Sequence, residues 1–361
     1  MSVAAAGVDT WSIAWYLREE SSGVRAMEHL ATDRAARSRL LPEKILGHRV
    51  GWFPGSRLVF AEGRPGGELG LCEPGELPGV VRLLAEGIRD RGVRLPTYDY
   101  RPSYGPGSEA RDEFAFRDKK GVVVPEGPTA RSAPAKFRRS LGDSGFAGVR
   151  RLDATVDLVF DSGSEGLAVL SGVAAVPMPR VAKKVQREAG GRRVETVWML
   201  GSSGRSVLGR WYDKGLESGS HRRGHRIRPE DQRRFAKDAR VPVDVVADPS
   251  YVRDSFVKRF APLWSASKGV VVGSQNDLID RVVELVESGE MSGGEAKAAL
   301  GHLLLDAGGQ RRLQSRATWY RDRSVCRRHG LVLADVDEDE VQIDLADVIG
   351  EALEADCWGV G

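Results

Sequence analysis

A tyrosine stands among basic residues in the stretch Gly201–Lys214, which reads GSSGRSVLGRWYDK. After a loop of glycine and serine the residue types alternate as in a β-strand, so Arg210 and Tyr212 point to one face and Trp211 to the other. A phenol beside Arg210 and Lys214 has the chemistry of a nucleophile that attacks phosphate. The alternative is an ordinary strand tyrosine, because aromatic residues are common in strands for packing reasons.

Two carboxylates lie on a strongly patterned strand, VRRLDATVDLVF, at residues 149–160. Alternation puts the apolar side chains on one face and Asp153 and Asp157 on the other, where they are either solvated or part of a site. Residues four apart on a regular strand are about 13 Å apart, too far to share one ion directly. Either a bulge draws the two together or only one of them is a ligand.

A third carboxylate lies in HRIRPEDQRRF, at residues 225–235. If this segment is extended, Glu230 shares a face with Arg226 and Arg228. A glutamate among arginines is either an ion-paired residue or part of the same site as the other two acids. Pro229 has no N–H to donate to a sheet, which predicts an edge strand or a bulge.

These three segments, in this order, resemble the replication initiation factors of the Rep_trans type, which start rolling-circle replication of small plasmids. RLDATVDLVF is similar to the family's TRLDLAxD strand, ETVWMLGSSGRSVLGRWYDKGLE to its ETxYxGxRxSxRxIRIYNKxxE block, and HRIRPEDQRR to its WRxExxxxR strand. The resemblance covers residues 149–234. The chain departs from the pattern at Asp213, where the family has asparagine, and at Pro229 before the glutamate.

The resemblance implies roles for specific residues. Tyr212 takes the place of the nucleophile. By their charge, Arg210 and Lys214 are expected either to bind the phosphate or to lower the pKa of the phenol. The implied ligands of a divalent cation, Mg²⁺ or Mn²⁺, are Asp153, Asp157 and Glu230. Arg226 and Arg228 are expected to bind DNA. The chain lacks the His-hydrophobic-His metal motif of the other initiator nucleases that use a tyrosine. It also lacks a Gly-rich loop ending in Gly-Lys-Ser/Thr, so ATP hydrolysis would come from a partner helicase.

The C-terminal third has the periodicity of helices. Helices are expected at 277–288, 294–305 and 314–329, followed by two short strands at 331–334 and 341–345 that would form a wing. This order resembles a winged helix-turn-helix. Its DNA-facing residues would be Arg316, Thr318, Trp319, Arg321 and Arg323. The alternative is a helical bundle with a solvated basic face.

The remaining pattern mixes strands and helices, which predicts an α+β fold. An antiparallel-sheet nicking domain is expected over residues 1–245 and a mainly helical DNA-binding domain over 246–361. Residues 97–148 are rich in Pro, Gly, Ser, Arg and Lys, which indicates a mobile insertion. The other expected elements are strands at 8–17, within 51–62 and at 193–200, and helices at 27–39, 79–91 and 165–175.

Composition is that of an ordinary soluble protein, with 361 residues, 41% hydrophobic and 29% charged. The net charge of +3 hides a basic segment at 222–240 and an acidic one at 335–347. The three cysteines are widely spaced and odd in number, which argues against a disulfide framework or zinc site. No apolar run reaches the roughly 18 residues of a membrane span. We therefore expect a cytoplasmic protein that does not contact membranes.

These observations predict a rolling-circle replication initiator that nicks one DNA strand by tyrosine transesterification, leaving a 5′-phosphotyrosine and a free 3′-hydroxyl. Expected partners are origin DNA, as duplex or extruded hairpin, single-stranded DNA, a host helicase and a polymerase, with a homodimer as one assembly. The alternatives are a relaxase of a conjugative or integrative element with the same chemistry, and a non-catalytic DNA-binding regulator on the same fold. Origin sequence is not deducible.

Overall fold

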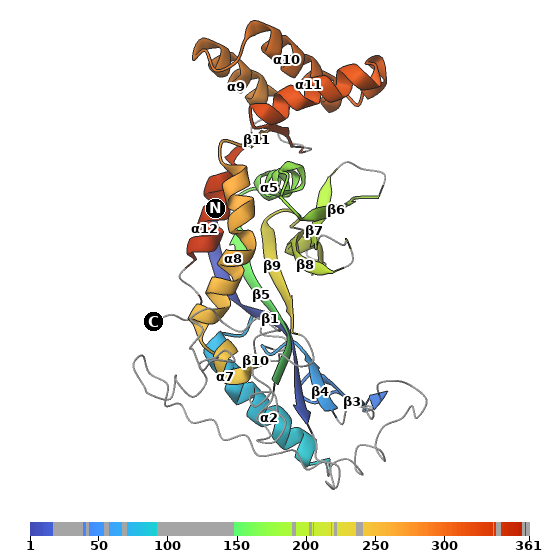
Figure 1. Ribbon diagram of the computed structural model, residues 1–361, viewed down its shortest axis with the longest axis vertical. Helices are drawn as coiled ribbons and strands as arrows, with labels where there is room; N and C mark the ends of the chain where they lie inside the picture. The colour runs from blue at the N-terminus through green and yellow to red at the C-terminus, as the bar shows by residue number, and fades with distance from the viewer. Residues whose placement is uncertain are drawn as a thin grey trace, which may run out of the picture. The chain divides into compact units, whose positions relative to one another are not determined.

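The structure is a computed structural model (Figure 1). It describes residues 1–16, 39–40, 43–53, 58–66, 71–91, 148–189, 193–201, 204, 206–217, 219, 222–235, 241–334, 336, 341–355 and 358. Nearly all of the expected helix at 27–39 and of the expected insertion at 97–148 lies outside these residues.

The chain divides into two compact units. Unit 1 consists of Met1–Ala6, Thr155–Asp231 and Ser255–Cys357. Unit 2 consists of Gly7–Ala154, Gln232–Asp254 and Trp358–Gly361. The candidate site on residues 157–230 belongs to unit 1, while the expected domain boundary at residue 245 stays a prediction.

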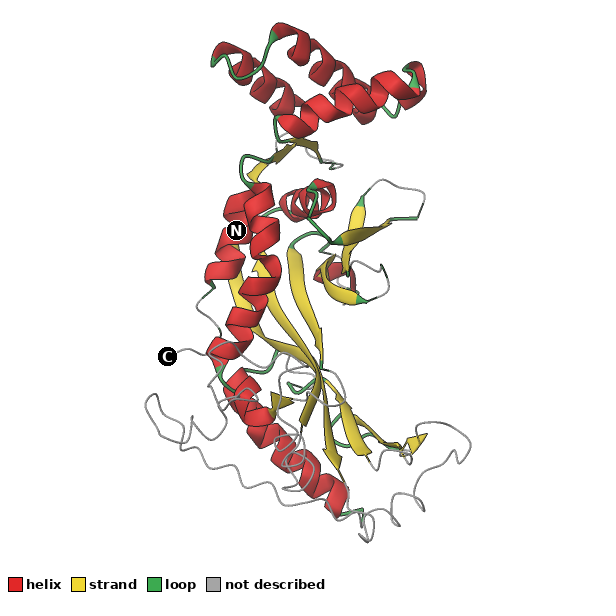
Figure 2. Cartoon of the chain, viewed as in Figure 1, coloured by secondary structure: helices red, strands yellow, loops and turns green. Residues whose placement is uncertain are grey.

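Ten described strands form one sheet, in the order β2-β3-β4-β1-β5-β9-β8-β7-β6, with β10 paired to β5 (Figure 2). The strands are β1 (Ser2–Tyr16), β2 (Arg39–Leu40), β3 (Arg49–Phe53), β4 (Leu58–Gly63), β5 (Gly148–Val159), β6 (Ala182–Arg187), β7 (Val194–Leu200), β8 (Val207–Asp213), β9 (Arg226–Arg234) and β10 (Val241–Pro242). The pairs β1–β4, β3–β4, β6–β7, β7–β8 and β8–β9 are all antiparallel. The expected α+β fold with a large antiparallel sheet is therefore confirmed.

A second sheet of three strands, in the order β12-β11-β13, belongs to unit 1. Its strands are β11 (Val271–Gly273), β12 (Leu331–Leu333) and β13 (Gln342–Asp344). The helices in the described part of the chain are η3 (Pro74–Glu76), α2 (Leu77–Arg89), α5 (Gly163–Ala175), α6 (Lys214–Glu217), α7 (Val243–Val246), α8 (Pro249–Ser267), α9 (Gln275–Glu287), α10 (Gly293–Ala307), η4 (Arg311–Leu313), α11 (Arg316–Arg328) and α12 (Leu345–Glu354).

The period-two alternation of β8 gives the sheet of unit 1 two chemically different faces. Trp211 is fully buried and meets Phe260 of α8 edge-on, with ring centres 5.8 Å apart. On β9, Asp231 accepts hydrogen bonds from Ser255 Oγ at 2.9 Å and Arg259 Nε at 2.7 Å, both on α8. Helix α8 therefore covers this face, and Arg210, Tyr212 and Glu230 point to the opposite one.

The expected edge strand at Pro229 was wrong. Strand β9 lies between β5 and β8, and its pairing with β8 runs through Trp211↔Pro229 without a shift in register. In an antiparallel pair, alternate residues make no ladder bonds to a given neighbour, so one missing N–H need not interrupt the pairing. The continuous register is what places Glu230 opposite Arg210.

The three expected C-terminal helices are present as α9, α10 and α11. Serine side chains at positions 274, 292 and 315 cap their N-termini by accepting hydrogen bonds from backbone N–H groups. Their apolar faces share one core with strands of the small sheet, whose buried members include Leu278, Val282, Leu303, Cys326 and Leu331. The helical part of the prediction is thus confirmed.

The strands after α11 do not form the expected wing. A wing is a hairpin, in which consecutive strands pair with each other, but β12 and β13 lie on opposite sides of β11. Strand β12 is parallel to β11 and β13 is antiparallel to it. The residues after α11 are therefore used to extend a sheet that begins before α9, rather than to form a separate hairpin.

Candidate active site

Adjacent strands β8 and β9 bring a tyrosine and a glutamate together. Tyr212 Oη donates a hydrogen bond to Glu230 Oε2 at 3.4 Å. Both side chains are buried, with Tyr212 2% exposed and Glu230 fully enclosed. The pairing follows from register, because Arg210 lies opposite Glu230 and Tyr212 lies opposite Arg228. The surroundings of the phenol oxygen are thus charged rather than apolar.

Arg210 links the carboxylate to the aromatic ring. Its Nε and Nη2 donate to the two oxygens of Glu230 at 3.0 and 2.9 Å, a bidentate pair. Its guanidinium carbon lies 4.0 Å from the ring centre of Tyr212 and 5.5 Å from that of Trp198, which is its cross-strand neighbour on β7. The Arg210 side chain is 19% exposed, so the guanidinium is the more accessible partner of the buried carboxylate.

A second buried ion pair lies on β5 and β9. Arg228 donates from Nε and Nη2 to the two carboxylate oxygens of Asp157, at 2.5 and 2.7 Å. Arg226 Nη2 lies 3.2 Å from Asp157 Oδ2, and its side chain is 46% exposed. The face therefore carries alternating cations and anions, with exposed arginine at its rim.

Helix α6 adds one more charged pair at the end of β8. Lys214 Nζ donates to Glu217 Oε2 at 2.5 Å, and Arg210 Nη2 lies 3.6 Å from Glu217 Oε1. Glu217 is 36% exposed, whereas Glu230 has no exposure, so Arg210 faces one half-exposed and one buried carboxylate. Lys214 Nζ is also 5.8 Å from the Tyr212 ring centre.

Asp213 holds the connection between β8 and β9. Its two oxygens accept hydrogen bonds from the backbone N–H groups of Leu216, at 3.2 Å, and Gly224, at 2.9 Å. Gly224 has φ +75°, and a side chain there would lie 1.9 Å from the Gly163 carbonyl oxygen, so only glycine fits. Burial raises the pKa of Asp213, and the backbone hydrogen bonds oppose this rise. Asp213 therefore fixes the loop that carries α6.

The phenol of Tyr212 is held protonated in this arrangement. Burial raises its pKa above the ordinary range, and the Glu230 carboxylate raises it further, while Arg228 and Arg210 act in the opposite direction. A protonated phenol is a weak nucleophile, so attack requires a base that takes its proton. Glu230 is the carboxylate within reach of that proton.

The third predicted ligand, Asp153, belongs to unit 2. Arg151 Nε and Nη2 donate to its oxygens at 2.9 and 2.5 Å, and Arg151 Nη1 lies 3.5 Å from Glu62. Asp153 and Asp157 thus have separate arginine partners on one strand, as the spacing of about 13 Å allows.

The fit of the predicted Mg²⁺ or Mn²⁺ is tested by these donors. Both oxygens of Asp153, Asp157 and Glu230 accept hydrogen bonds from a guanidinium group. Within the described part of the chain, no group of three or more His, Cys, Asp or Glu side chains is placed to hold a metal ion. Carboxylates whose two oxygens both accept hydrogen bonds from arginine do not fit a divalent cation, because the cation needs those same oxygens as ligands.

The predicted DNA-facing residues of α11 divide by exposure. Arg316 and Arg321 are exposed, and Arg321 Nε lies 3.0 Å from Asp322 Oδ1. Thr318 and Arg323 are partly buried. Trp319 is 4% exposed and packs on His302 of α10, with ring centres 4.4 Å apart, so it lies in the core rather than on the surface. The physical reason is the helical period, which turns Trp319 toward α10.

Three neighbours of the predicted residues were not recognised from the sequence. They are Glu217, Trp198 and Tyr320, which contact Lys214, Arg210 and Arg316 respectively. A signal for Glu217 existed, because Lys214 and Glu217 are three residues apart and such pairs meet on one helical turn. Trp198 and Tyr320 carried no comparable signal.

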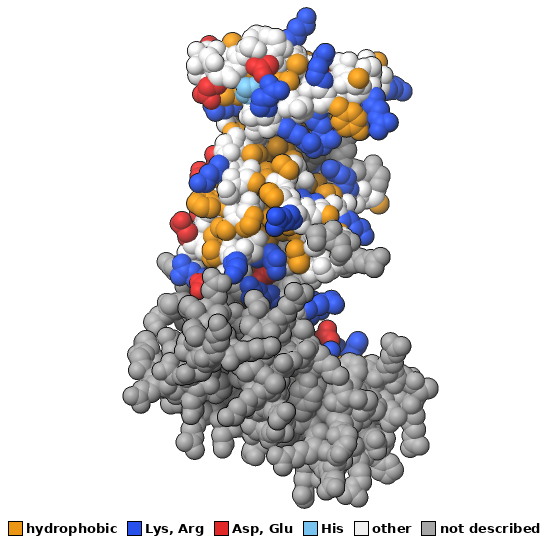
Figure 3. All heavy atoms as spheres, viewed as in Figure 1, with side chains coloured by type: hydrophobic (Ala, Val, Ile, Leu, Met, Phe, Trp, Pro, Cys, Tyr) orange, Lys and Arg blue, Asp and Glu red, His pale blue; other side chains and the backbone are white. Residues whose placement is uncertain are grey.

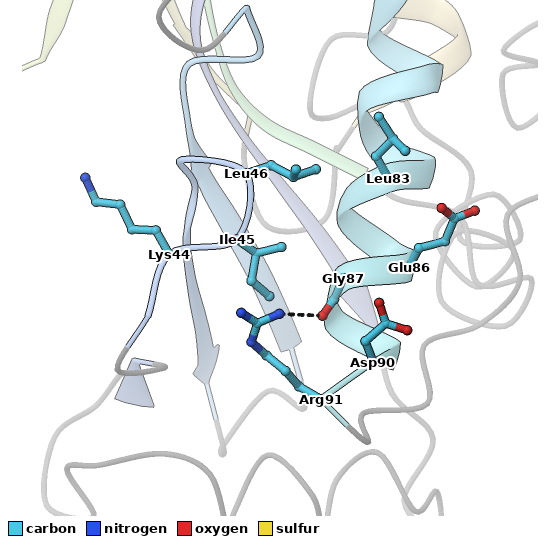
Figure 4. Close-up of a pocket in the computed structure, with 8 residues that line it drawn as sticks. All are labelled: Lys44, Ile45, Leu46, Leu83, Glu86, Gly87, Asp90 and Arg91. Carbon is cyan, nitrogen blue, oxygen red and sulfur yellow. Dashed lines mark hydrogen bonds between the residues drawn. The ribbon is translucent and has the colours of Figure 1, made fainter.

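One pocket, of about 370 Å³, lies in unit 2 between residues 44–46 and α2 (Figure 4). Arg91 Nη1 donates to the Gly87 carbonyl oxygen at 2.9 Å at its end. None of the predicted site residues lines this pocket, so it is separate from the cluster around Tyr212.

Among the helices described, none is both long and apolar enough to cross a membrane.

No protein family matches the sequence, and no curated protein matches it. A solved structure, that of a rolling circle replication initiator protein from Geobacillus stearothermophilus, is similar with a TM-score of 0.31 and 12% sequence identity. The similarity covers 71% of this chain and 84% of that chain. A similarity at this level does not establish the function of this chain.

Proposed function

We propose that this protein is a DNA strand-nicking and joining enzyme of the replication-initiator type, in which Tyr212 is the nucleophile. The observation that supports the proposal is the hydrogen bond from Tyr212 Oη to Glu230, beneath a guanidinium group. A phenol, a base and phosphate-binding cations on one sheet face are the groups that transesterification of a phosphodiester requires.

The reaction balances with the groups of this face. The Tyr212 proton passes to Glu230, and the phenol oxygen forms a bond to phosphorus as the bond from phosphorus to the 3′-oxygen breaks. The 3′-oxygen takes up a proton from Lys214 or solvent, which leaves a 5′-phosphotyrosine and a free 3′-hydroxyl. Joining is the reverse: a 3′-hydroxyl attacks the phosphotyrosine and releases the phenol.

Arg210 must change partners for this step. In the structure its guanidinium donates hydrogen bonds to both oxygens of Glu230. A phosphodiester is an alternative anionic partner for a guanidinium, and planar bidentate binding suits both. Transfer of Arg210 from Glu230 to the phosphate leaves Glu230 free to accept the Tyr212 proton. The substrate itself thereby activates the nucleophile.

The finer points of the proposal come from the resemblance. The DNA would be an origin, bound as duplex or extruded hairpin, and a host helicase and polymerase would extend the free 3′-hydroxyl. A requirement for Mg²⁺ or Mn²⁺ remains a prediction to be tested in the reaction. A relaxase of a mobile element would use the same chemistry, and the neighbouring genes distinguish the two.

The test uses supercoiled plasmid that carries the DNA flanking the gene, incubated with the full chain and Mg²⁺, Mn²⁺ or EDTA. We expect relaxed DNA and a covalent adduct whose tryptic peptide bears nucleotide on Tyr212. Tyr212→Phe should give neither product. An adduct that persists in Tyr212→Phe removes Tyr212 from the role, and an adduct formed equally in EDTA removes the metal requirement.

A non-catalytic DNA-binding regulator is the second candidate. It is favoured by the burial of Tyr212 and by the arginine partners of Asp157 and Glu230, an arrangement that is stable without any reaction. This candidate predicts binding of DNA with no adduct in any buffer, and equal binding by Tyr212→Phe. The same experiment therefore decides between the two.

A further inference from the structure

The helical part of unit 1 carries a basic stripe that is separate from the residues around Tyr212. Lys and Arg side chains gather over α9, α10 and α11 in Figure 3. On α11 the basic residues recur at helical spacing, and η4 adds two more just before it. We call this the α11 surface, made of Arg311, Arg312, Arg316, Tyr320, Arg323 and Arg327.

Tyr320 is the aromatic residue of this surface. Its side chain is 46% exposed, and the guanidinium carbons of Arg316 and Arg311 lie 5.7 and 5.9 Å from its ring centre. The pKa of its phenol is lowered, mainly by the hydrogen bond and charge of Arg316 and to a smaller extent by Arg311. The preceding residue, Trp319, is buried against His302, which fixes this turn of α11 against α10.

The arginines of the α11 surface differ from the other arginines of the same helix. Arg321 and Arg328 have carboxylate partners, Asp322 at 3.0 Å and Glu295 at 2.6 Å. Within the described residues, no carboxylate lies within 4 Å of any basic group of the α11 surface. Burial lowers the pKa of Arg327, and the nearby positive charge of Arg323 lowers it further. A row of cations without a nearby carboxylate creates a positive potential that attracts an anionic partner.

We infer that the α11 surface binds an unpaired nucleic-acid strand, with a base stacked on Tyr320 and phosphates at the flanking arginines. An unpaired strand supplies flat rings and regularly spaced negative charge together, which matches an exposed ring between guanidinium groups. An acidic peptide would satisfy the arginines and leave the ring unused. A duplex keeps its bases stacked on one another, so they are not open to a side chain.

This inference rests on the proposed function only in taking a nucleic acid as the partner. It replaces the expected reading of duplex base edges by α11 with binding of a single strand, as a nicked or extruded origin would expose. The cluster around Tyr212 and the α11 surface share no residue, so each can fail without the other.

The test measures binding of the full chain to a fluorescently labelled 20-nucleotide oligo-dT by anisotropy. Tyr212→Phe serves as the background, so that no cleavage occurs. We expect Tyr320→Ala to weaken binding roughly fivefold or more, and Tyr320→Phe to stay within about twofold, because stacking needs the ring and not the hydroxyl. Changing Arg311 and Arg316 to Gln should lower the slope of log K against log salt by about 1.4.

Three controls make the outcome decisive. Leu304→Ala, an equally exposed apolar position on α10, and Arg281→Gln on α9 should leave binding unchanged. An abasic strand should bind as weakly as Tyr320→Ala does to oligo-dT. Equal affinity for oligo-dT, the abasic strand and heparin would reduce the surface to a polyanion site. An equal loss on duplex and oligo-dT in Tyr320→Ala would overturn the preference for an unpaired strand.

Discussion

At the scale of single residues, Glu230 is the side chain that contacts both the proposed nucleophile, Tyr212, and the guanidinium of Arg210. It is fully buried, yet it bears a formal charge that Arg210 compensates through two hydrogen bonds. Removing one partner of a buried pair leaves the other uncompensated, and that cost exceeds the net value of the pair. Stability and chemistry are therefore coupled at this position.

Glu230→Gln is expected to lower the free energy of unfolding by about 3 kcal/mol, measured by urea denaturation. The matched control is Glu217→Gln, which touches the same arginine but is 36% exposed and should cost less than about 1 kcal/mol. Glu230→Gln should also slow adduct formation at least ~100-fold, because the base is lost. Equal stability and adduct rates in the two variants would contradict both the buried pair and the role of base.

At the scale of elements, the loop between β8 and β9 positions α6 and hence Lys214 and Glu217. Gly224→Ala should destabilise the chain by roughly 3 kcal/mol, since φ is positive and the new side chain meets the Gly163 carbonyl oxygen. Gly219→Ala is the control, with a similar φ of +70° and open space around it, and should cost about 1 kcal/mol. Thermal unfolding compares them; equal losses would mean that contact with α5 is unimportant.

Strand β6 contributes a half-buried lysine, Lys183, whose pKa lies in an accessible pH range. Lys183 Nζ donates to the carbonyl oxygens of Val173 and Val176 at the end of α5, and burial lowers its pKa to about 8. An unfolded lysine has a pKa of about 10.4, so between these values the unfolded chain binds more protons. The free energy of unfolding should then rise with pH across that window, by at most about 3 kcal/mol, and this term is flat below pH 8.

The measurement is urea denaturation at pH 7, 8.5 and 10 for the wild type and Lys183→Met. The difference between the two should change across the series in favour of the wild type. Lys184→Met, at an exposed position of the same strand, is the control and should track the wild type. A difference that stays constant with pH would mean that Lys183 keeps an ordinary pKa.

The elements were more predictable than their contacts. Alternation in β8 placed Arg210 and Tyr212 on one face, and Ser315 was recognised as a cap, because both depend on local spacing. The partner of each charge was not predictable: Asp157 pairs with Arg228 across 71 residues, and only strand order decides this. Trp319 was misplaced because an aromatic residue among arginines has two faces available, and packing against His302 selects one.

At the scale of the whole molecule, the two compact units do not follow the chain in order. Unit 1 takes residues from both sides of the expected domain boundary at 245, since it contains β8, β9 and most of α8. Helix α8 supplies the apolar cover of the sheet through Phe256 and Phe260, which are buried and pack with their rings tilted at 60° and their centres 4.8 Å apart. The sheet that carries Tyr212 thus depends on residues beyond 245.

A fragment of residues 1–245 is therefore expected not to fold as an independent nicking domain. Without α8, Trp211 loses its contact with Phe260, and Asp231 loses Ser255 and Arg259 while its charge stays in the sheet. Exposure of this apolar surface and the loss of two hydrogen-bond donors to the buried Asp231 carboxylate together cost several kcal/mol, comparable to the whole stability of a domain. The fragment should lack a cooperative urea transition and near-ultraviolet circular dichroism, both of which the full chain should show. A fragment that unfolds cooperatively and still forms the Tyr212 adduct would establish the boundary at 245 and show that α8 is dispensable for the site.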